Sequence, residues 1–187
     1  MDSASSQESN QIELSDIVDI VTRVQVVDEP QDVPFPQADS FSRVIDLLNQ
    51  LHAVGNLSQE EITANYAFDP RQTQYYATAG VFLNLIERQY SREEGVSYGL
   101  TQSGTDIMSQ RPAQRNLALV ERILKHRVFH NAVSLYLDQV AKPTPDQVVA
   151  IMRKANIELD REGNTTMNRR AQTVLSWVDW MFGPTRD

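Results

Sequence analysis

The sequence predicts a mainly α-helical fold made of two consecutive helix-turn-helix units, the first of which carries a small β-hairpin as a wing. Apolar residues recur at the helical period of about 3.6 along most of the 187 residues. The order helix, short helix, turn, long helix occurs twice, and an alternating segment with glycines follows its first occurrence. We therefore expect an acidic tail and extended linker over residues 1–39, a first winged-helix domain over residues 40–111 and a second helix-turn-helix domain over residues 112–187.

The first 39 residues are expected to lack a compact fold. Residues 1–11 are polar and predict a mobile tail. Residues 12–24 carry apolar side chains at helical spacing, and although their valines and isoleucines favour strands, the spacing favours a short helix. Three prolines in residues 28–36 indicate an extended linker, because proline fixes φ and has no N–H to donate.

The first unit opens with two predicted helices. An apolar stripe over residues 41–51 predicts a helix that ends at Gly55, since glycine readily adopts the backbone conformation that follows a helix. Ser58 and Glu61 have the spacing of a capping box, in which each side chain accepts a hydrogen bond from the other residue's N–H. They predict a short second helix over residues 59–66.

The third helix of this unit is expected to start at Asp69, because an N-cap aspartate followed by Pro70 is a strong start signal. We expect this helix to continue through Ile86. Residues 88–100 contain two glycines and end in an apolar-polar alternation, which predicts a β-hairpin that would form the wing. A short helix that stops by Pro112 should follow.

The second unit is expected to contain helices only. Apolar periodicity over residues 113–140 predicts one long or broken helix, and Thr144 caps the next one, over residues 146–155. A polar break at residues 158–164 precedes the last helix, which Gly183 ends. The buried stripe of this last helix is expected to consist of Met167, Ala171, Val174, Trp177, Val178 and Met181.

The opposite face of the last helix carries side chains that suit DNA recognition. In a helix-turn-helix protein the second helix of the motif enters the major groove, and its first turns contact base edges. Arginine pairs with guanine, asparagine and glutamine pair with adenine, and basic side chains bind phosphates. The predicted DNA-binding residues are Arg71, Gln72, Gln74 and Tyr75 in the first unit and Arg153, Lys154, Thr165, Asn168, Arg169, Arg170 and Gln172 in the second.

The charge distribution favours the second unit as the main DNA contact. The net charge is −8, and residues 1–40 account for all of it with nine acidic residues and one arginine. Residues 41–109 balance at −4 and residues 110–187 at +4. Attraction for a polyanion therefore belongs to the C-terminal half. A solvated helix face is the alternative interpretation there, and a protein-facing role is the alternative in the first unit.

Several function classes have no support in the sequence. Without cysteines the chain forms no disulfide, and without an apolar run of about 20 residues or a signal peptide it is expected to be cytoplasmic and away from membranes. No acid lies two residues before a lysine, as common metal-dependent nucleases require, and no phosphate loop or nucleophile motif occurs. His126 and His130 are four residues apart but have no third ligand. We expect no enzyme, no cofactor and no metal.

Three runs resemble an uncharacterised tandem winged-helix module that accompanies restriction endonucleases and related restriction-modification proteins of prokaryotes. They are residues 69–76, residues 98–104, and the run Arg-Arg-Ala-Gln-Thr-Val-Leu-Ser-Trp at 169–177 with the tryptophan at 180. The resemblance covers residues 30–182 and implies double-stranded DNA binding, with the cutting domain elsewhere. Whether the chain is a specificity subunit, a regulator or an excised fragment stays open.

The leading hypothesis is a non-catalytic, sequence-reading protein of a restriction-modification system that binds double-stranded DNA. One alternative is a protein-interaction adaptor whose winged helices bind a nuclease or methyltransferase partner. Another is an autonomous transcriptional regulator that binds a two-fold symmetric site as a dimer. Salt separates the first two, because released counterions make DNA binding weaken steeply as salt rises.

Overall fold

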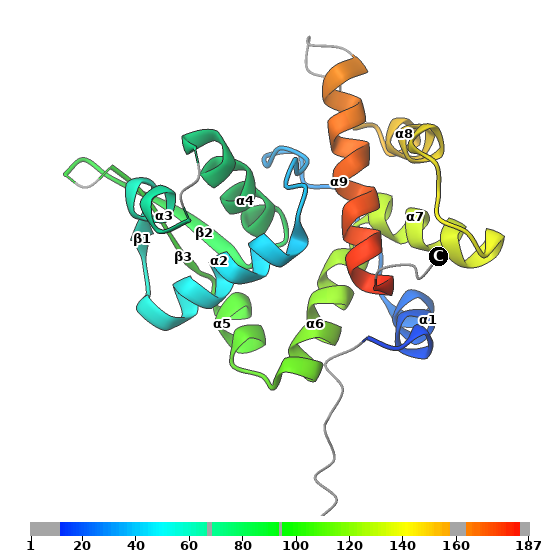
Figure 1. Ribbon diagram of the computed structural model, residues 1–187, viewed down its shortest axis with the longest axis horizontal. Coiled ribbons are helices and arrows are strands. Elements are labelled where there is room, and N and C mark those ends of the chain that lie inside the picture. The colour runs from blue at the N-terminus through cyan, green and yellow to red at the C-terminus, as the bar shows by residue number, and fades with distance from the viewer. Residues whose placement is uncertain (1–11, 67–68, 94, 158–163, 184–187) are drawn as a thin grey trace, which may run out of the picture.

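The computed structural model describes residues 12–66, 69–93, 95–157 and 164–183. Within these ranges the fold is mainly helical, as predicted, with nine α-helices and one three-stranded antiparallel sheet. The molecule is elongated, with the sheet at one end, α1, α7 and α8 at the other, and α9 between them (Figure 1). The expected mobile tail of residues 1–11 and most of the expected polar break at 158–164 lie outside the described residues.

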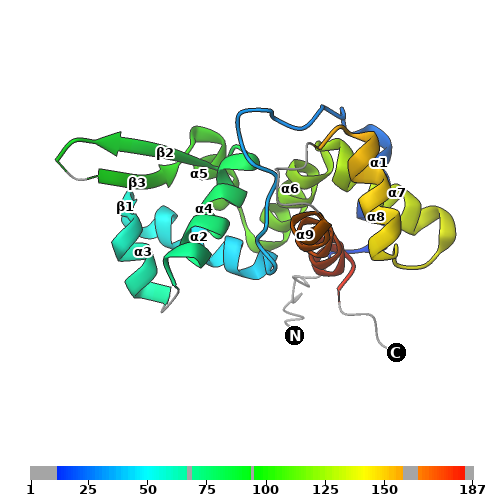
Figure 2. The same cartoon turned by 90° about the horizontal axis from the view of Figure 1, so that it is seen from above.

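The N-terminal half contains the sheet and the helices around it. Its elements are α2 (Phe41–Val54), β1 (Leu57–Ser58), α3 (Gln59–Tyr66), α4 (Pro70–Phe82), β2 (Ile86–Ser91) and β3 (Gly95–Leu100). The strand order is β1-β3-β2, and the β2–β3 hairpin projects from the body of the molecule (Figure 2). The predicted hairpin is thereby confirmed. Strand β1 was not predicted, because two residues are too few to show a period.

Side-chain caps start α3 and α4 where the sequence predicts. The Ser58 N–H donates to Glu61 Oε2 at 2.7 Å and the Glu61 N–H donates to Ser58 Oγ at 3.2 Å, which completes the capping box. The hydrogen bond from the Ser58 backbone N–H lowers the pKa of Glu61. Asp69 Oδ1 accepts hydrogen bonds from the N–H groups of Arg71 and Gln72 at 2.8 and 3.0 Å.

Helix α4 ends at Phe82 and does not continue through Ile86 as expected. Asn84 adopts a left-handed φ of 54°, and the Leu85 N–H donates back to the Gly80 carbonyl at 2.9 Å. This C-terminal motif stops the helix and turns the chain, so that Ile86 begins β2 instead. A Cβ on Gly80 would lie 2.3 Å from Ile86 Cδ1, which shows how closely α4 packs on this strand.

The C-terminal half is a set of packed helices. They are α5 (Gln102–Met108), α6 (Pro112–Leu124), α7 (Arg127–Gln139), α8 (Pro145–Lys154) and α9 (Asn164–Phe182). The helix expected over residues 113–140 is therefore broken, at His126. The Thr144 N-cap of α8 is confirmed by a 3.3 Å hydrogen bond from the Gln147 N–H, and Gly183 has the positive φ of 75° expected of a glycine that follows a helix.

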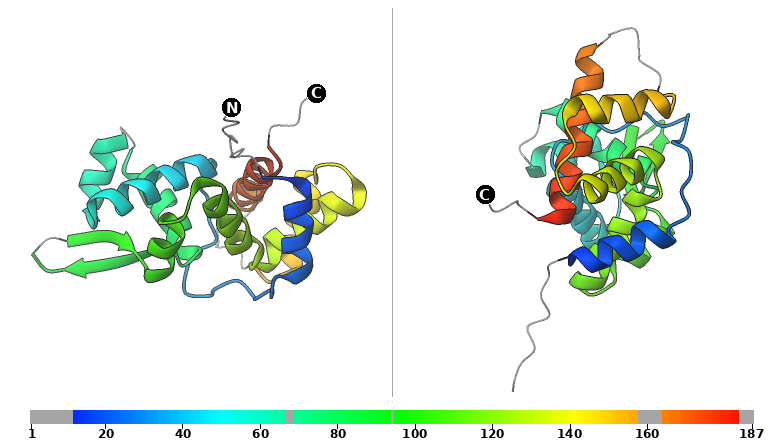
Figure 3. Two further views of the ribbon diagram at one scale, coloured as in Figure 1. Left: turned by 90° about the horizontal axis from the view of Figure 1, so that it is seen from below. Right: turned by 90° about the vertical axis from the view of Figure 1, so that its right-hand side faces the viewer.

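Residues 12–39 contribute to the core, which corrects the expectation of a tail and linker. The predicted short helix is α1 (Leu14–Arg23), which packs on α6 and α7 and buries Ile17 and Ile20 (Figure 3). Residues 24–39, which we call the strap, run on from α1 along the outside of the molecule to α2 (Figure 2). Within the strap, the ring of Phe35 stacks on that of Phe129 with centroids 5.7 Å apart.

One continuous core joins the two halves. Phe41 of α2 packs against Trp177 and Trp180 of α9, with ring centroids 4.8 and 4.5 Å apart. The apolar stripe predicted for α9 is buried in full. Because the halves share this core, α4 and α9 are held in a fixed relation. No helix in the described parts of the chain is long and apolar enough to cross a bilayer.

Candidate functional site

A groove of about 520 Å³ lies between α4 and α9. Five of the eleven predicted site residues line it. Gln72 and Tyr75 come from α4, and Asn168, Arg169 and Gln172 come from α9. The other lining residues are Gln37, Asp39, Tyr76 and Thr173. We call this space the α4–α9 groove.

Helical geometry explains why these side chains meet. Residues three or four apart lie on one helix face, so Gln72 and Tyr75 share a face of α4, and Asn168 and Gln172 share a face of α9. The first turns of the two helices lie on the same side of the molecule, at the top of Figure 1. Residues almost a hundred positions apart in the sequence therefore face one space.

The floor of the groove is a buried tyrosine in a short hydrogen bond. The Tyr76 hydroxyl donates to Asp39 Oδ1 at 2.5 Å, and only 2% of Tyr76 is exposed. Burial raises the pKa of Tyr76, and the hydrogen bond to the Asp39 carboxylate together with its negative charge raises it further. The phenol is therefore neutral at pH 7. The neighbouring ring, Tyr75, is half-buried.

The end of the strap sets the width of the groove. Tyr76 binds Asp39 from the α4 side. From the α9 side, Trp177 Nε1 donates to the Ala38 carbonyl at 2.9 Å and Ser176 Oγ donates to the Asp39 carbonyl at 2.5 Å. Asp39 is thus hydrogen-bonded to both helices at once, and Ala38 to α9. Sequence reasoning missed this role because Asp39 was counted with the acidic tail.

A second groove, of about 330 Å³, adjoins the first between α8 and α9. Arg153 of α8 lines it together with Asn168, which also lines the α4–α9 groove. Asn168 therefore stands on the ridge between the two grooves. Arg153 joins the same surface as the five residues described above.

Three other predicted residues, Arg71, Gln74 and Lys154, are exposed but line neither groove. Thr165 belongs to α9, but its side chain lies outside the described part of the structure. Within the described residues, no ion pair engages the exposed cations Arg71, Arg153, Lys154 and Arg169. None of these four side chains is therefore held in an ion pair there.

Arg170 does not belong to this surface. Only 4% of it is exposed, and it follows Met167 by three residues and precedes Val174 by four, which places it on the buried face of α9. It lines a separate cavity of about 270 Å³ beside the strap, which Glu29 also lines. A side chain in this position does not reach a phosphate on the outer surface, which corrects the expectation based on residue type alone.

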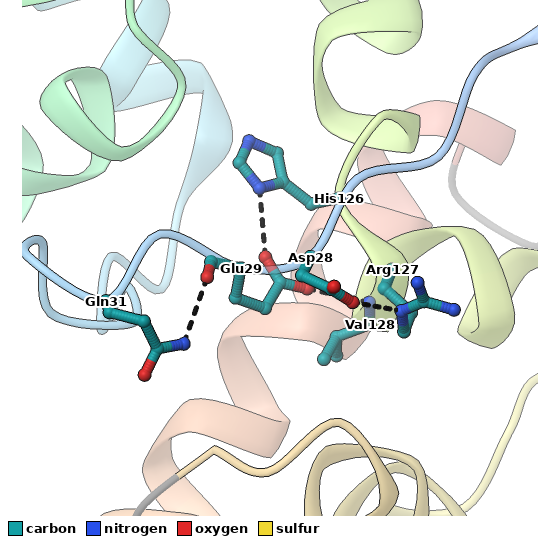
Figure 4. Close-up of polar contacts among 6 residues, drawn as sticks. All are labelled: Asp28, Glu29, Gln31, His126, Arg127 and Val128. Atoms are coloured by element: carbon teal, nitrogen blue, oxygen red, sulfur yellow. Dashed lines mark hydrogen bonds and ion pairs between the residues drawn. The ribbon is translucent and has the colours of Figure 1, made fainter.

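His126 has a structural role next to the strap (Figure 4). Its Nδ1 lies 2.9 Å from Glu29 Oε2, and Glu29 Oε1 accepts the Val128 N–H at 2.8 Å, so that Glu29 caps the start of α7 from a distant part of the chain. His130 instead donates from Nε2 to the Val21 carbonyl at 3.1 Å. The described residues contain no group of three His, Cys, Asp or Glu placed to hold a metal ion.

Comparison with known proteins gives a family but no activity. No curated protein and no solved structure matches the chain. A family model described as a domain of unknown function, DUF7226, matches residues 43–186, which run from α2 through α9 and carry both helices of the groove. With most of its length matched, the chain belongs to the DUF7226 family.

Proposed function

We propose that this protein binds double-stranded DNA through the surface formed by the first turns of α4 and α9 and by the end of α8, and that it does so without catalysing a reaction. One observation carries the proposal. The sequence predicts DNA-binding residues on α4 and on α9 from two separate segments, and five of these residues line one groove between the two helices. A polar face that arose by chance on each helix would have no reason to face the other.

The order of elements in the N-terminal half supports this proposal. Helix, strand, helix, helix and hairpin follow one another, with strand order β1-β3-β2. We interpret α2 to β3 as a winged helix in which α4 is the recognition helix and the β2–β3 hairpin the wing. We interpret α7 to α9 as a second helix-turn-helix unit with α9 as its recognition helix.

The local charge also favours a polyanion, although the whole chain is acidic. The exposed cations Arg71, Arg153, Lys154 and Arg169 lie on or beside the proposed surface, whereas many of the acids lie in the first 40 residues. Glu29 and Asp39 are held in hydrogen bonds of their own. Phosphate contacts depend on such local cations and not on the net charge.

Binding of a labelled random duplex by Arg169→Ala tests the proposal. Loss of one phosphate contact should weaken binding several-fold without a change in folding, because the side chain is exposed. Arg23→Ala is the matched control, since Arg23 is also exposed and lies at the end of α1, away from the first turns of α4 and α9 (Figure 1). Arg170→Ala is not suitable, because it removes a buried side chain.

The resemblance to modules of restriction-modification proteins supports a place in such a system, where a separate nuclease or methyltransferase would act on the bound DNA. A salt titration tests this against an adaptor that binds only the partner protein. Duplex binding that falls steeply with salt supports the proposal. The adaptor would be favoured if the protein binds no duplex but binds, independently of salt, a nuclease or methyltransferase whose gene neighbours its own.

A further inference from the structure

We propose that the α4–α9 groove holds a single nucleotide that is not stacked in a duplex. This inference deepens the proposed function and rests on it where the nucleotide belongs to a DNA strand. A free nucleotide presents the same base, sugar and phosphate, so the test below separates the two sources.

Size is the first reason. The groove measures about 520 Å³, which falls within the range of about 300–1,000 Å³ that is usual for sites of small ligands. The major groove of DNA, in contrast, is about 12 Å wide and receives a whole protein helix. Side chains that face a space of this volume between two helices of their own chain can surround one small unit such as a nucleotide.

The polar lining is the second reason. Gln72 approaches from α4, and Asn168 and Gln172 approach from α9. Each amide offers both a donor and an acceptor, the combination that pairs with the edge of a base. Because these amides come from opposite walls, they can contact two sides of one base. This is more than a single helix can do from within a DNA groove.

The ring and the charge complete a site for a nucleotide. Tyr75 is half-buried in the lining, and aromatic side chains stack on unstacked bases of any sequence. Arg169 lies in the same lining, is exposed, and makes no ion pair within the described residues, so its guanidinium is available to a phosphate. The lining thus contains a group for each part of a nucleotide except the sugar.

The site is formed before any ligand arrives. The Tyr76–Asp39 hydrogen bond and the bonds from Ser176 and Trp177 to the strap hold the two walls at a fixed distance. A preformed site loses little conformational entropy on binding. The unfavourable step is then removal of the base from its stack, which is easiest for a base that is unpaired.

The test measures binding of the full chain to three probes: a matched duplex, the same duplex with one extra unpaired nucleotide, and deoxynucleoside monophosphates. We expect the bulged duplex to bind about tenfold more tightly than the matched one. Gln72→Ala combined with Gln172→Ala should abolish this preference, so that the variant binds the bulged duplex no more tightly than the matched one. Gln114→Ala, an exposed glutamine on α6, is the matched control and should keep the preference.

The outcomes separate this inference from the proposed function. Monophosphate binding that the double variant abolishes, without a preference for the bulge, assigns the groove to a free nucleotide. Equal binding of both duplexes together with no monophosphate binding overturns the inference and leaves the proposed function intact. Monophosphate binding without any duplex binding overturns the proposed function and leaves the groove as a nucleotide site.

Discussion

Val140 ends α7 in the left-handed region, with φ 51° and ψ 34°, and 87% of it is exposed. A β-branched residue is strained there by its Cβ, at a cost of about 1–2 kcal/mol, and its exposed side chain gains little from packing. Val140→Gly should therefore raise the free energy of unfolding by about 1 kcal/mol, measured by denaturant titration. Val140→Ala keeps the Cβ and should gain less. An equal gain from both would show that the strain lies elsewhere.

The buried hydrogen bond of Tyr76 predicts a dependence of stability on alkaline pH. Because the pKa of Tyr76 is raised above its ordinary value of 10.0, the folded protein holds this proton more tightly than the unfolded chain does. The resulting stabilisation is complete below about pH 10 and is lost as the pH rises beyond it.

Unfolding free energies measured across this alkaline range should consequently fall more steeply for the wild-type protein than for Tyr76→Phe. The control is Tyr90→Phe, because Tyr90 is 72% exposed on the hairpin. Parallel curves for the wild-type protein and Tyr76→Phe would contradict the role of Tyr76.

For single residues, the sequence predicted correctly the burial or exposure of the described α9 side chains that it named, with the exception of Arg170. The buried stripe of α9 and the exposed positions of Asn168, Arg169 and Gln172 all agree with the structure. Arg170 does not, although its spacing from Met167 placed it on the buried face. The prediction for Arg170 rests on its residue type, whereas consecutive helical residues point about 100° apart and therefore face different surroundings.

Among the elements, α4 depends on its N-cap. Asp69 accepts two N–H groups of the first turn, and an aspartate there also interacts favourably with the helix dipole. Asp69→Ala should lower the free energy of unfolding by about 1 kcal/mol, whereas Asp69→Asn keeps the acceptor and should lose less. Thermal unfolding of both variants checks this. Equal losses would mean that the cap does not stabilise α4.

Element boundaries were predictable where they depend on local chemistry. The starts of α3, α4 and α8 follow from caps within three residues, and the sequence indicated all of them. The break between α6 and α7 follows from contacts with the strap, where Val27 pairs with His126 across 99 positions of sequence. No window of sequence contains both partners, so the break could not be located.

For the whole molecule, the strap packs on both halves in addition to their shared core. Its Glu29 carboxylate satisfies two buried groups, on His126 and Val128 (Figure 4). Glu29→Ala would leave both without that partner, at about 1–3 kcal/mol each, and should lower the free energy of unfolding accordingly. Glu29→Gln retains an acceptor and should lose less. Limited proteolysis should cut the strap faster in the alanine variant. An unchanged cleavage rate would contradict the role of Glu29 in holding the strap against α7.

The candidate site was predictable as two lists of residues but not as one groove. Periodicity identified the exposed faces of α4 and α9 separately. Their meeting depends on the shared core around Phe41 and Trp177 and on the strap bonds at Ala38 and Asp39, all of which are long-range contacts. The prolines of the strap predict extended backbone, but that prediction does not say against which surface the segment packs.

The most direct measurement for the whole molecule is the salt dependence of duplex binding, from about 50 to 200 mM, for the wild-type protein and for Arg169→Gln combined with Lys154→Gln. The slope of log K against log salt is negative, and each lost phosphate contact should reduce its magnitude by about 0.9. The double variant should therefore show a slope that is less steep by about two. A wild-type slope near zero, or the same slope in both proteins, would contradict DNA binding through this surface.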